Sequence, residues 1–202
     1  YSTLGIPLYE GRELSATWRA AAAARIETHR KADLTVQVRD LSGNPVPGAT
    51  VRVKMKRHAF GFGSAVQGGR VMSTDTADAA YVANQTYRDK IKELFNWAVL
   101  ENDLKWSAWE PTKDTVNPAT ALGTLDWLRN NRMNGLRGHT LIWPDFSNMP
   151  GWVLTEYNRQ ITANGQSAAD AWLRARVTSH IAGEASAVGA RVDRWDVLNE
   201  PF

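Results

Sequence analysis

The sequence has 202 residues, of which 43% are hydrophobic and 22% are charged, and its formal net charge is +3. This composition is typical of a globular protein of one or two domains, and the scattered basic residues exclude a nucleic-acid footprint. The absence of cysteine excludes disulfides and thiolate metal sites, and no apolar run is long enough to span a bilayer.

The first 57 residues are predicted to form an accessory extension rather than a catalytic element. Residues 14–30 favour a helix, because apolar residues recur every four positions around a run of alanines. Residues 34–40 and 49–55 alternate apolar and polar side chains, which is the strand pattern, and turn residues fill positions 42–48 between them. We therefore expect an N-terminal helix and a β-hairpin over residues 1–57.

Strand and helix patterns alternate from residue 58 to residue 202, which we treat as the main domain. The four expected strands cover residues 60–66, 95–100, 135–143 and 194–199. Helices are expected at 83–94, from Asn117 and Pro118 onward, and from a capping box at Ser167–Asp170 to Gly189. This alternation predicts an α/β fold with a parallel sheet and crossover helices. A doubly wound sheet is the alternative, but its Gly-rich phosphate loop is not found after the first strand.

Polar side chains gather directly after three of the expected strands. Glu101, Asn102 and Lys105 follow the second strand, residues 139–145 close the third, and Asn199 and Glu200 close the fourth. The carboxyl ends of parallel strands meet at one side of an eight-fold barrel, where the active sites of such barrels lie. Each cluster also has a plain structural explanation: an exposed helical face with an ion pair, a core histidine satisfied by backbone at His139, and a solvated turn at Asn199–Pro201.

Three longer motifs resemble glycoside hydrolase family 10, whose members are mostly endo-β-1,4-xylanases on a (β/α)8 TIM barrel. The motifs are residues 95–106 with Glu110-Pro111, Arg137–Trp143, and Trp195–Glu200, and they occur in family order. The match covers roughly residues 58–202, and the stretch from residue 30 to 65 looks like the hairpin ahead of the barrel in plant-type members. The resemblance implies that this chain supplies about the first four βα units of a secreted, extracellular xylanase.

The resemblance also implies a role for each residue of the polar clusters. Retaining glycosidases use two carboxyl groups about 5–5.5 Å apart, one as acid/base and the other as nucleophile. Glu200 would be the acid/base, with a pKa raised by a partly apolar pocket and a second carboxylate. Asn199 would hold the sugar's 2-hydroxyl, and His139 would contact the sugar at the cleavage site beside a wall formed by Trp143. Further hydrogen bonds to sugar hydroxyls would come from Glu101, Asn102 and Lys105.

Two departures from the family pattern stand out. Family members usually have histidine where this chain has Pro144, which donates no hydrogen bond, and Asp145 could substitute for that contact. The family's nucleophile is a glutamate at the end of strand seven, and no residue here matches that motif, so we assign none. We therefore expect a partner chain with the C-terminal half of the barrel, arising from a nick, a split gene or engineering. Tyr1, which is not methionine, is interpreted as a processed or cut end.

We expect neither a metal nor an organic cofactor, because the four histidines lie far apart without ligand spacing, and no nucleic-acid or membrane partner. Among the nine tryptophans, five lie at or just after strand ends and favour sugar stacking, namely Trp97, Trp106, Trp109, Trp143 and Trp152. Three lie in helical patterns and favour the core, namely Trp18, Trp127 and Trp172. Two alternative functions stay open: another β-1,4-glycanase of the same clan A, such as a cellulase, and a non-catalytic carbohydrate-binding or scaffold protein.

Overall fold

The structure is a computed structural model that describes residues 10–201. The chain divides into two compact units, residues 1–54 and residues 55–202. In the first unit, helix α1 (Thr17–Arg30) confirms the predicted helix, although it begins later than expected. Trp18 is 45% exposed, so its expected place in a core is wrong. Its indole Nε1 instead donates to the carbonyl of Gly11, whose positive φ of 75° suits glycine.

The predicted hairpin is present only as its turn. Asp40 accepts hydrogen bonds from the backbone amides of Ser42 and Asn44, and Val46 N donates to Val38 O at 3.0 Å. Beyond an isolated antiparallel bridge at the turn, the described residues 34–55 contain no strand. The alternating apolar side chains of these segments are between 37% and 71% exposed. A two-stranded hairpin without a buried face is marginally stable, which explains the difference from the prediction.

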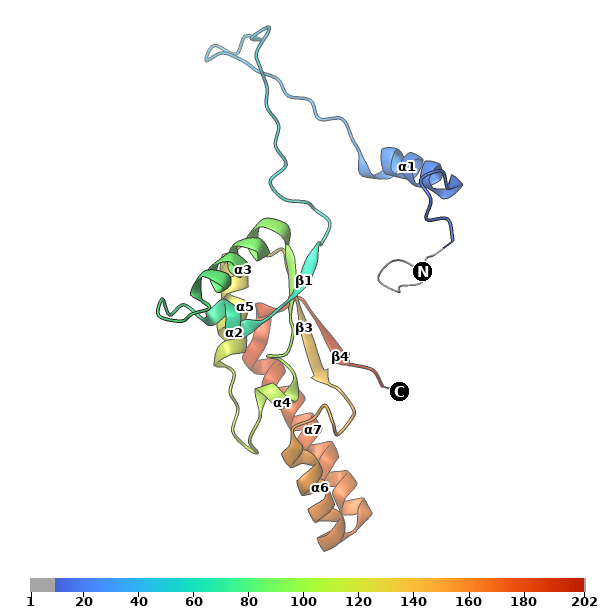
Figure 1. Cartoon of the computed structure of the whole chain (residues 1–202), viewed down its shortest axis with the longest axis vertical. Coiled ribbons are helices and arrows are strands. Elements are labelled where there is room, and N and C mark those ends of the chain that lie inside the picture. The colour runs from blue at the N-terminus through green and yellow to red at the C-terminus, as the bar shows by residue number, and fades with distance from the viewer. Residues whose placement is uncertain (1–9, 202) are drawn as a thin grey trace. The chain divides into compact units, whose positions relative to one another are not determined.

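The second unit confirms the predicted parallel sheet and is part of a TIM barrel. Its four strands are β1 (Gly63–Val66), β2 (Trp97–Leu100), β3 (Gly135–Ile142) and β4 (Arg194–Leu198). They are parallel and hydrogen-bonded in the order β1-β2-β3-β4. The intervening helices are α2 (Gly68–Met72), α3 (Tyr81–Leu94), α4 (Trp106–Trp109), α5 (Ala119–Asn130), α6 (Gly151–Asn164) and α7 (Gln166–Val188), with the 3-10 turn η1 (Gly189–Arg191). Strands and helices alternate along the chain, as in consecutive βα units (Figure 1).

The third crossover is longer than predicted and contains two helices instead of one. Helix α6 was not expected, because Pro150-Gly151 at its start has the composition of a turn. Helices α6 and α7 pack side by side as a hairpin (Figure 1). The boundary between them is Gly165, with a φ of +83°, so the predicted capping box at Ser167 is wrong. Asp170 instead accepts a hydrogen bond from the hydroxyl of Tyr157 on α6.

The two faces of the sheet differ in character. Alternate strand residues such as Leu100 and Leu136 are fully buried against helices α3 and α5, where Leu125 and Leu128 complete the main core. Trp127 packs against this cluster, and Trp172 packs against a second cluster around Val153, as predicted for both. The remaining strand positions point to the opposite face, which is the interior side of the barrel, and that face carries the polar residues considered below.

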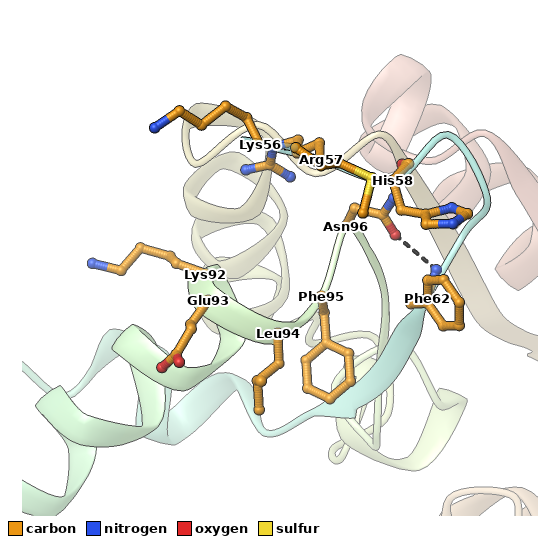
Figure 2. A pocket seen from close by; sticks show the side chains of 10 residues that line it. Lys56, Arg57, His58, Phe62, Lys92, Glu93, Leu94, Phe95 and Asn96 are labelled. Atoms are coloured by element: carbon orange, nitrogen blue, oxygen red, sulfur yellow. Dashed lines mark hydrogen bonds between the residues drawn. The ribbon is translucent and has the colours of Figure 1, made fainter. Parts of the chain in front are cut away.

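Asn96 stabilises the amino end of the sheet, which is the end opposite to the predicted site. Its buried amide accepts a hydrogen bond from Phe62 N at 2.7 Å (Figure 2). The same amide donates to the carbonyls of His58 and Phe60 at 2.6 and 2.9 Å. These bonds fix the segment that leads into β1 against the segment that leads into β2. A small hollow of about 150 Å³ lies here, and the lysines at its rim, Lys56 and Lys92, extend away from Asn96.

Arg88 on α3 is a buried cation that stabilises the end of α2. Its Nη1 donates to the carbonyls of Arg70, Val71 and Ser73 at 3.2, 3.1 and 2.7 Å. The last carbonyls of a helix lack intrahelical partners, and a guanidinium there also opposes the negative end of the helix dipole. Asn84 and Arg88 are both buried on α3, so the inward face of this helix is partly polar.

Candidate active site

Glu200 lies directly after β4 in a position set by the neighbouring strand. The amide of Asn199 donates to the carbonyl of Ile142 at 2.8 Å, which continues the pairing of β3 and β4 past the end of β4. Glu200 then takes a positive φ of 44°, a backbone conformation that non-glycine residues adopt sparingly and that clusters at functional sites. The sharp turn places Glu200 at a cleft of about 370 Å³, which it lines with Trp143, Pro144 and Asp145.

The loop after β2 lies beside this cleft and meets the end of β3 through Lys105. Leu104 is fully buried and anchors the loop, while Glu101 and Asn102 are exposed. Lys105 Nζ donates to Asn102 Oδ1 at 2.8 Å and lies 5.3 Å from the ring centroid of Trp143, within cation–π range. The structure therefore brings Asn102 and Lys105, which follow β2, together with Trp143, which follows β3.

His139 belongs to an ion-pair cluster on the interior face of the sheet. Its Nδ1 lies 2.9 Å from Asp196 Oδ2, and Arg137 Nε and Nη2 lie 2.8 and 2.7 Å from the two oxygens of the same carboxylate. Burial by itself would raise the pKa of Asp196, but the bonds from Arg137 and His139 outweigh it and hold that pKa below its usual value. The His139 ring lies 6.0 Å from the Trp143 ring at 66°, which places it at the same wall as Lys105.

Sequence reasoning missed Asp196, although a signal for it was present. Arg137 and His139 occupy alternate positions of β3 and so share one face, and two basic groups on a partly buried face call for a counter-charge. Asp196 is the register partner of His139 on the adjacent strand. The prediction that His139 lies at the site stays compatible with the structure, but its ring is oriented by a carboxylate and not by backbone.

The tryptophans expected to stack on a ligand divide between cleft and core. Trp106 and Trp109 are each only 3% exposed, so they cannot offer a face to a ligand and that expectation is wrong for them. Trp152 donates its indole N–H to the carbonyl of Glu110 at 3.0 Å and packs in the second core cluster. Of the five, Trp143 is the one that lines the cleft shared with Glu200 in the described part of the chain.

The chemistry available at this end of the sheet is that of an open polar cleft with one aromatic wall. A carboxyl group, a lysine, a histidine and an amide surround an indole ring, which suits a ligand with both hydroxyl groups and an apolar face. Within residues 10–201, no cluster of three or more His, Asp or Glu side chains could hold a metal ion. No helix of the described segment is long and apolar enough to cross a membrane.

Comparison with known proteins agrees with this geometry. The family model "Glycosyl hydrolase family 10" matches residues 55–202. The chain belongs to glycosyl hydrolase family 10. The matched region coincides with the second unit and contains the sheet, the cleft and Glu200. The family assignment thus confirms the resemblance seen in the three motifs.

Individual relatives of this family 10 chain fall into two kinds. The anti-sigma-I factor RsgI6 of Acetivibrio thermocellus is 31% identical over 183 residues, which is 91% of this chain and 21% of that protein. Endo-1,4-beta-xylanase 1 of Humicola insolens is 32% identical over 140 residues, 67% of this chain and 29% of that enzyme. The crystal structure of xylanase B from Clostridium stercorarium F9 shares the fold with a TM-score of 0.55 at 22% identity, over 70% of this chain and 41% of that one. The chain therefore spans less than half the length of each of these proteins.

Proposed function

We propose that this family 10 chain contributes the acid/base half of a retaining endo-β-1,4-xylanase, with Glu200 as the general acid/base. The observation that carries the proposal is the position of Glu200. It follows β4 at the carboxyl end of a family 10 sheet and lines a cleft whose wall is Trp143. In this mechanism Glu200 protonates the leaving glycosidic oxygen and later deprotonates the attacking water.

The surrounding residues support a sugar ligand in that cleft. Asn199 is the proposed partner of the 2-hydroxyl, a hydrogen bond that strengthens as the oxocarbenium-like transition state forms. Lys105 and Asn102 already contact each other beside Trp143, so both can reach hydroxyl groups of a sugar stacked on that ring. Glu101 is exposed one residue earlier, and His139 stands at the same wall. Xylan or a xylo-oligosaccharide is the proposed substrate, as the names of the xylanase relatives suggest.

The nucleophile is proposed to come from outside this chain, on βα units that close the barrel. Strands β1 and β4 are the two edges of the described sheet, and a closed barrel has no edges. On β4, Val197 and Leu198 are 59% and 53% exposed, as expected of positions that further barrel units would cover. We propose that a partner segment or second chain supplies those units, and that the assembled enzyme is secreted.

The test is release of reducing sugars from xylan by the chain combined with a polypeptide that carries the last four βα units. Glu200→Gln should abolish release because glutamine cannot donate or take up the proton. Glu156→Gln is the matched control, since Glu156 lies on α6, is not among the residues that line the cleft, and forms ion pairs with Arg159 and Lys113. Full activity of the Glu200→Gln assembly would refute the acid/base assignment.

A second candidate is a non-catalytic carbohydrate-binding module. The observation that favours it is the match to an anti-sigma-I factor, which covers 91% of this chain and so includes most of the unit ahead of the family domain. In that case the chain would bind xylohexaose with an affinity that depends on Trp143, and the assembled barrel would release no reducing sugar. Isothermal titration with xylohexaose beside the reducing-sugar assay distinguishes the two candidates.

A further inference from the structure

A buried histidine outside the cleft contacts both of the elements that form its walls. His180 lies on α7, and its side chain is 1% exposed. Its ring stacks on the ring of Trp106 with centroids 4.4 Å apart and an interplanar angle of 9°. Its Nε2 lies 3.0 Å from the carbonyl oxygen of Leu141 on β3. No other role for this residue follows from the proposed catalytic mechanism.

Each of these contacts is close in sequence to a residue of the cleft. Trp106 directly follows Lys105, and it begins helix α4. Leu141 lies two residues before Trp143 and directly before Ile142, whose carbonyl accepts the hydrogen bond from Asn199. His180 therefore contacts both the loop that carries Lys105 and the strand end that carries Trp143.

The Leu141 carbonyl determines which ring nitrogen of His180 donates. Nε2 lies 3.0 Å from that carbonyl oxygen, which can only accept a hydrogen bond, and 3.1 Å from Glu184 Oε2. Nε2 is therefore the donor to Leu141. Glu184 is fully buried one helical turn along α7, and burial raises its pKa. A flat ring with a donor at its tip can make both contacts, which neither an aliphatic nor a purely aromatic side chain of this size can do.

The buried carboxylate of Glu110 forms a second link between Trp106 and α7. The Trp106 indole N–H donates to Glu110 Oε2 at 2.9 Å, and Arg176 Nη2 donates to Glu110 Oε1 at 2.7 Å. Arg176 lies on α7, one turn before His180. The loop after β2 is thus held to α7 at both the face and the edge of the Trp106 ring.

We infer that His180 is a positioning residue that holds the two walls of the sugar cleft in register, Lys105 through Trp106 and Trp143 through Leu141. This inference rests on the proposed function, since it specifies how the sugar-binding residues are kept in place. His180 does not touch the ligand. Its loss should loosen the walls, and thereby weaken sugar binding, without removing any group that contacts sugar.

The test separates the two contacts with two substitutions. His180→Phe keeps a ring for Trp106 but loses the donor to Leu141, so hydrogen exchange should quicken in residues 141–146 and not in 103–109. His180→Gln keeps a donor but loses the stacking face, so the opposite pattern is expected. Because a hydrogen bond or an aromatic pair contributes about 0.5–1.5 kcal/mol, each variant should bind xylohexaose about three- to tenfold more weakly.

Val188→Ala is the control, because Val188 is fully buried in the main core at the C-terminal end of α7, eight residues beyond His180. It should lower stability while leaving exchange in both wall segments and the affinity for xylohexaose unchanged. The inference would be overturned if the two His180 variants showed the expected difference in hydrogen exchange but bound xylohexaose as tightly as the wild type. It would also be overturned if faster hydrogen exchange were confined to α7. If the wild-type chain binds no xylohexaose, the proposed function fails, and the exchange pattern of the two His180 variants alone decides whether His180 couples the walls.

Discussion

Replacing Asp196 by asparagine should destabilise the chain at neutral pH and not at low pH. Asp196 accepts a hydrogen bond from Arg137 Nε, forms an ion pair with Arg137 Nη2, and lies 2.9 Å from His139 Nδ1. Asparagine has a similar shape but no charge, and only one of its two terminal atoms can accept. Hydrogen bonds to charged groups contribute about 1.5–3 kcal/mol each, but solvent screens the half-exposed Arg137. We therefore expect a loss of about 2 kcal/mol, or about 4–8 °C in Tm for a chain of this size.

The pH dependence gives the sharper test. The pKa of Asp196 is lowered in the folded state, so its contribution is fully present above the unfolded pKa of about 3.9. That contribution is lost as the pH falls through the lower folded pKa, because a protonated aspartic acid then resembles asparagine. Urea denaturation followed by far-UV circular dichroism at pH 7 and pH 3 should show the difference between wild type and variant shrinking at the lower pH.

Asp126→Asn is the matched control for this experiment. Asp126 pairs with Arg191 at 2.7 Å, but both side chains are well exposed, so its replacement should cost less than about 1 kcal/mol at pH 7. A loss of stability at Asp196 that is no larger than the loss at Asp126, or that persists unchanged at pH 3, would refute the assignment of the effect to the partly buried charge of Asp196.

Four further substitutions test other features. Trp143→Ala should weaken xylohexaose binding about tenfold or more by titration calorimetry, because the stacking of a sugar ring on the indole is lost, and unchanged affinity would contradict the cleft assignment. Asp145→Ala should lower the xylan-hydrolysing rate of the assembled enzyme if Asp145 replaces the histidine absent at Pro144, and unaltered kinetics would remove that idea. Arg88→Ala should cost about 3 kcal/mol in urea denaturation by leaving three carbonyls of α2 without a donor. Gly138→Ala should cost about 1–3 kcal/mol, because its Cβ would lie 2.3 Å from the Trp195 ring.

The sheet was predictable because its strands carry short apolar runs in regular alternation with helices. All four strands lie within the predicted segments, and Gly189 ends α7 as expected. The sequence pattern predicted the secondary structure wrongly where tertiary contacts determine it. The segments 34–40 and 49–55 have strand periodicity but bury no face, and α6 begins at a Pro-Gly pair that also suits a turn.

The candidate site was predictable only as a set of motifs, because its geometry depends on contacts between βα units. Nothing in the sequence near Lys105 indicates that its ammonium lies over Trp143, or that Trp106 is buried beneath the loop. His180 was missed for the same reason, and the basic pair Arg137 and His139 identifies no counter-charge until β3 and β4 are known to be neighbours. Asp196 and His180 each lie in an ordinary strand or helix pattern, and the importance of each comes from partners more than 35 residues away in the chain, at distances of 57 and 39 residues.

The hydrogen bond from Asn199 to Ile142 has a consequence for how the proposed active site would be assembled. It ties Glu200 to the same strand end that carries Trp143, so the proposed proton donor and the aromatic wall are held by one pair of strands. A nucleophile on the other half of the barrel would be held by different strands. The spacing between the two carboxyl groups would then be set by how the two halves close on each other. Substitutions at the β4 edge, remote from any sugar, should therefore alter the rate of hydrolysis while leaving the contacts within this chain intact.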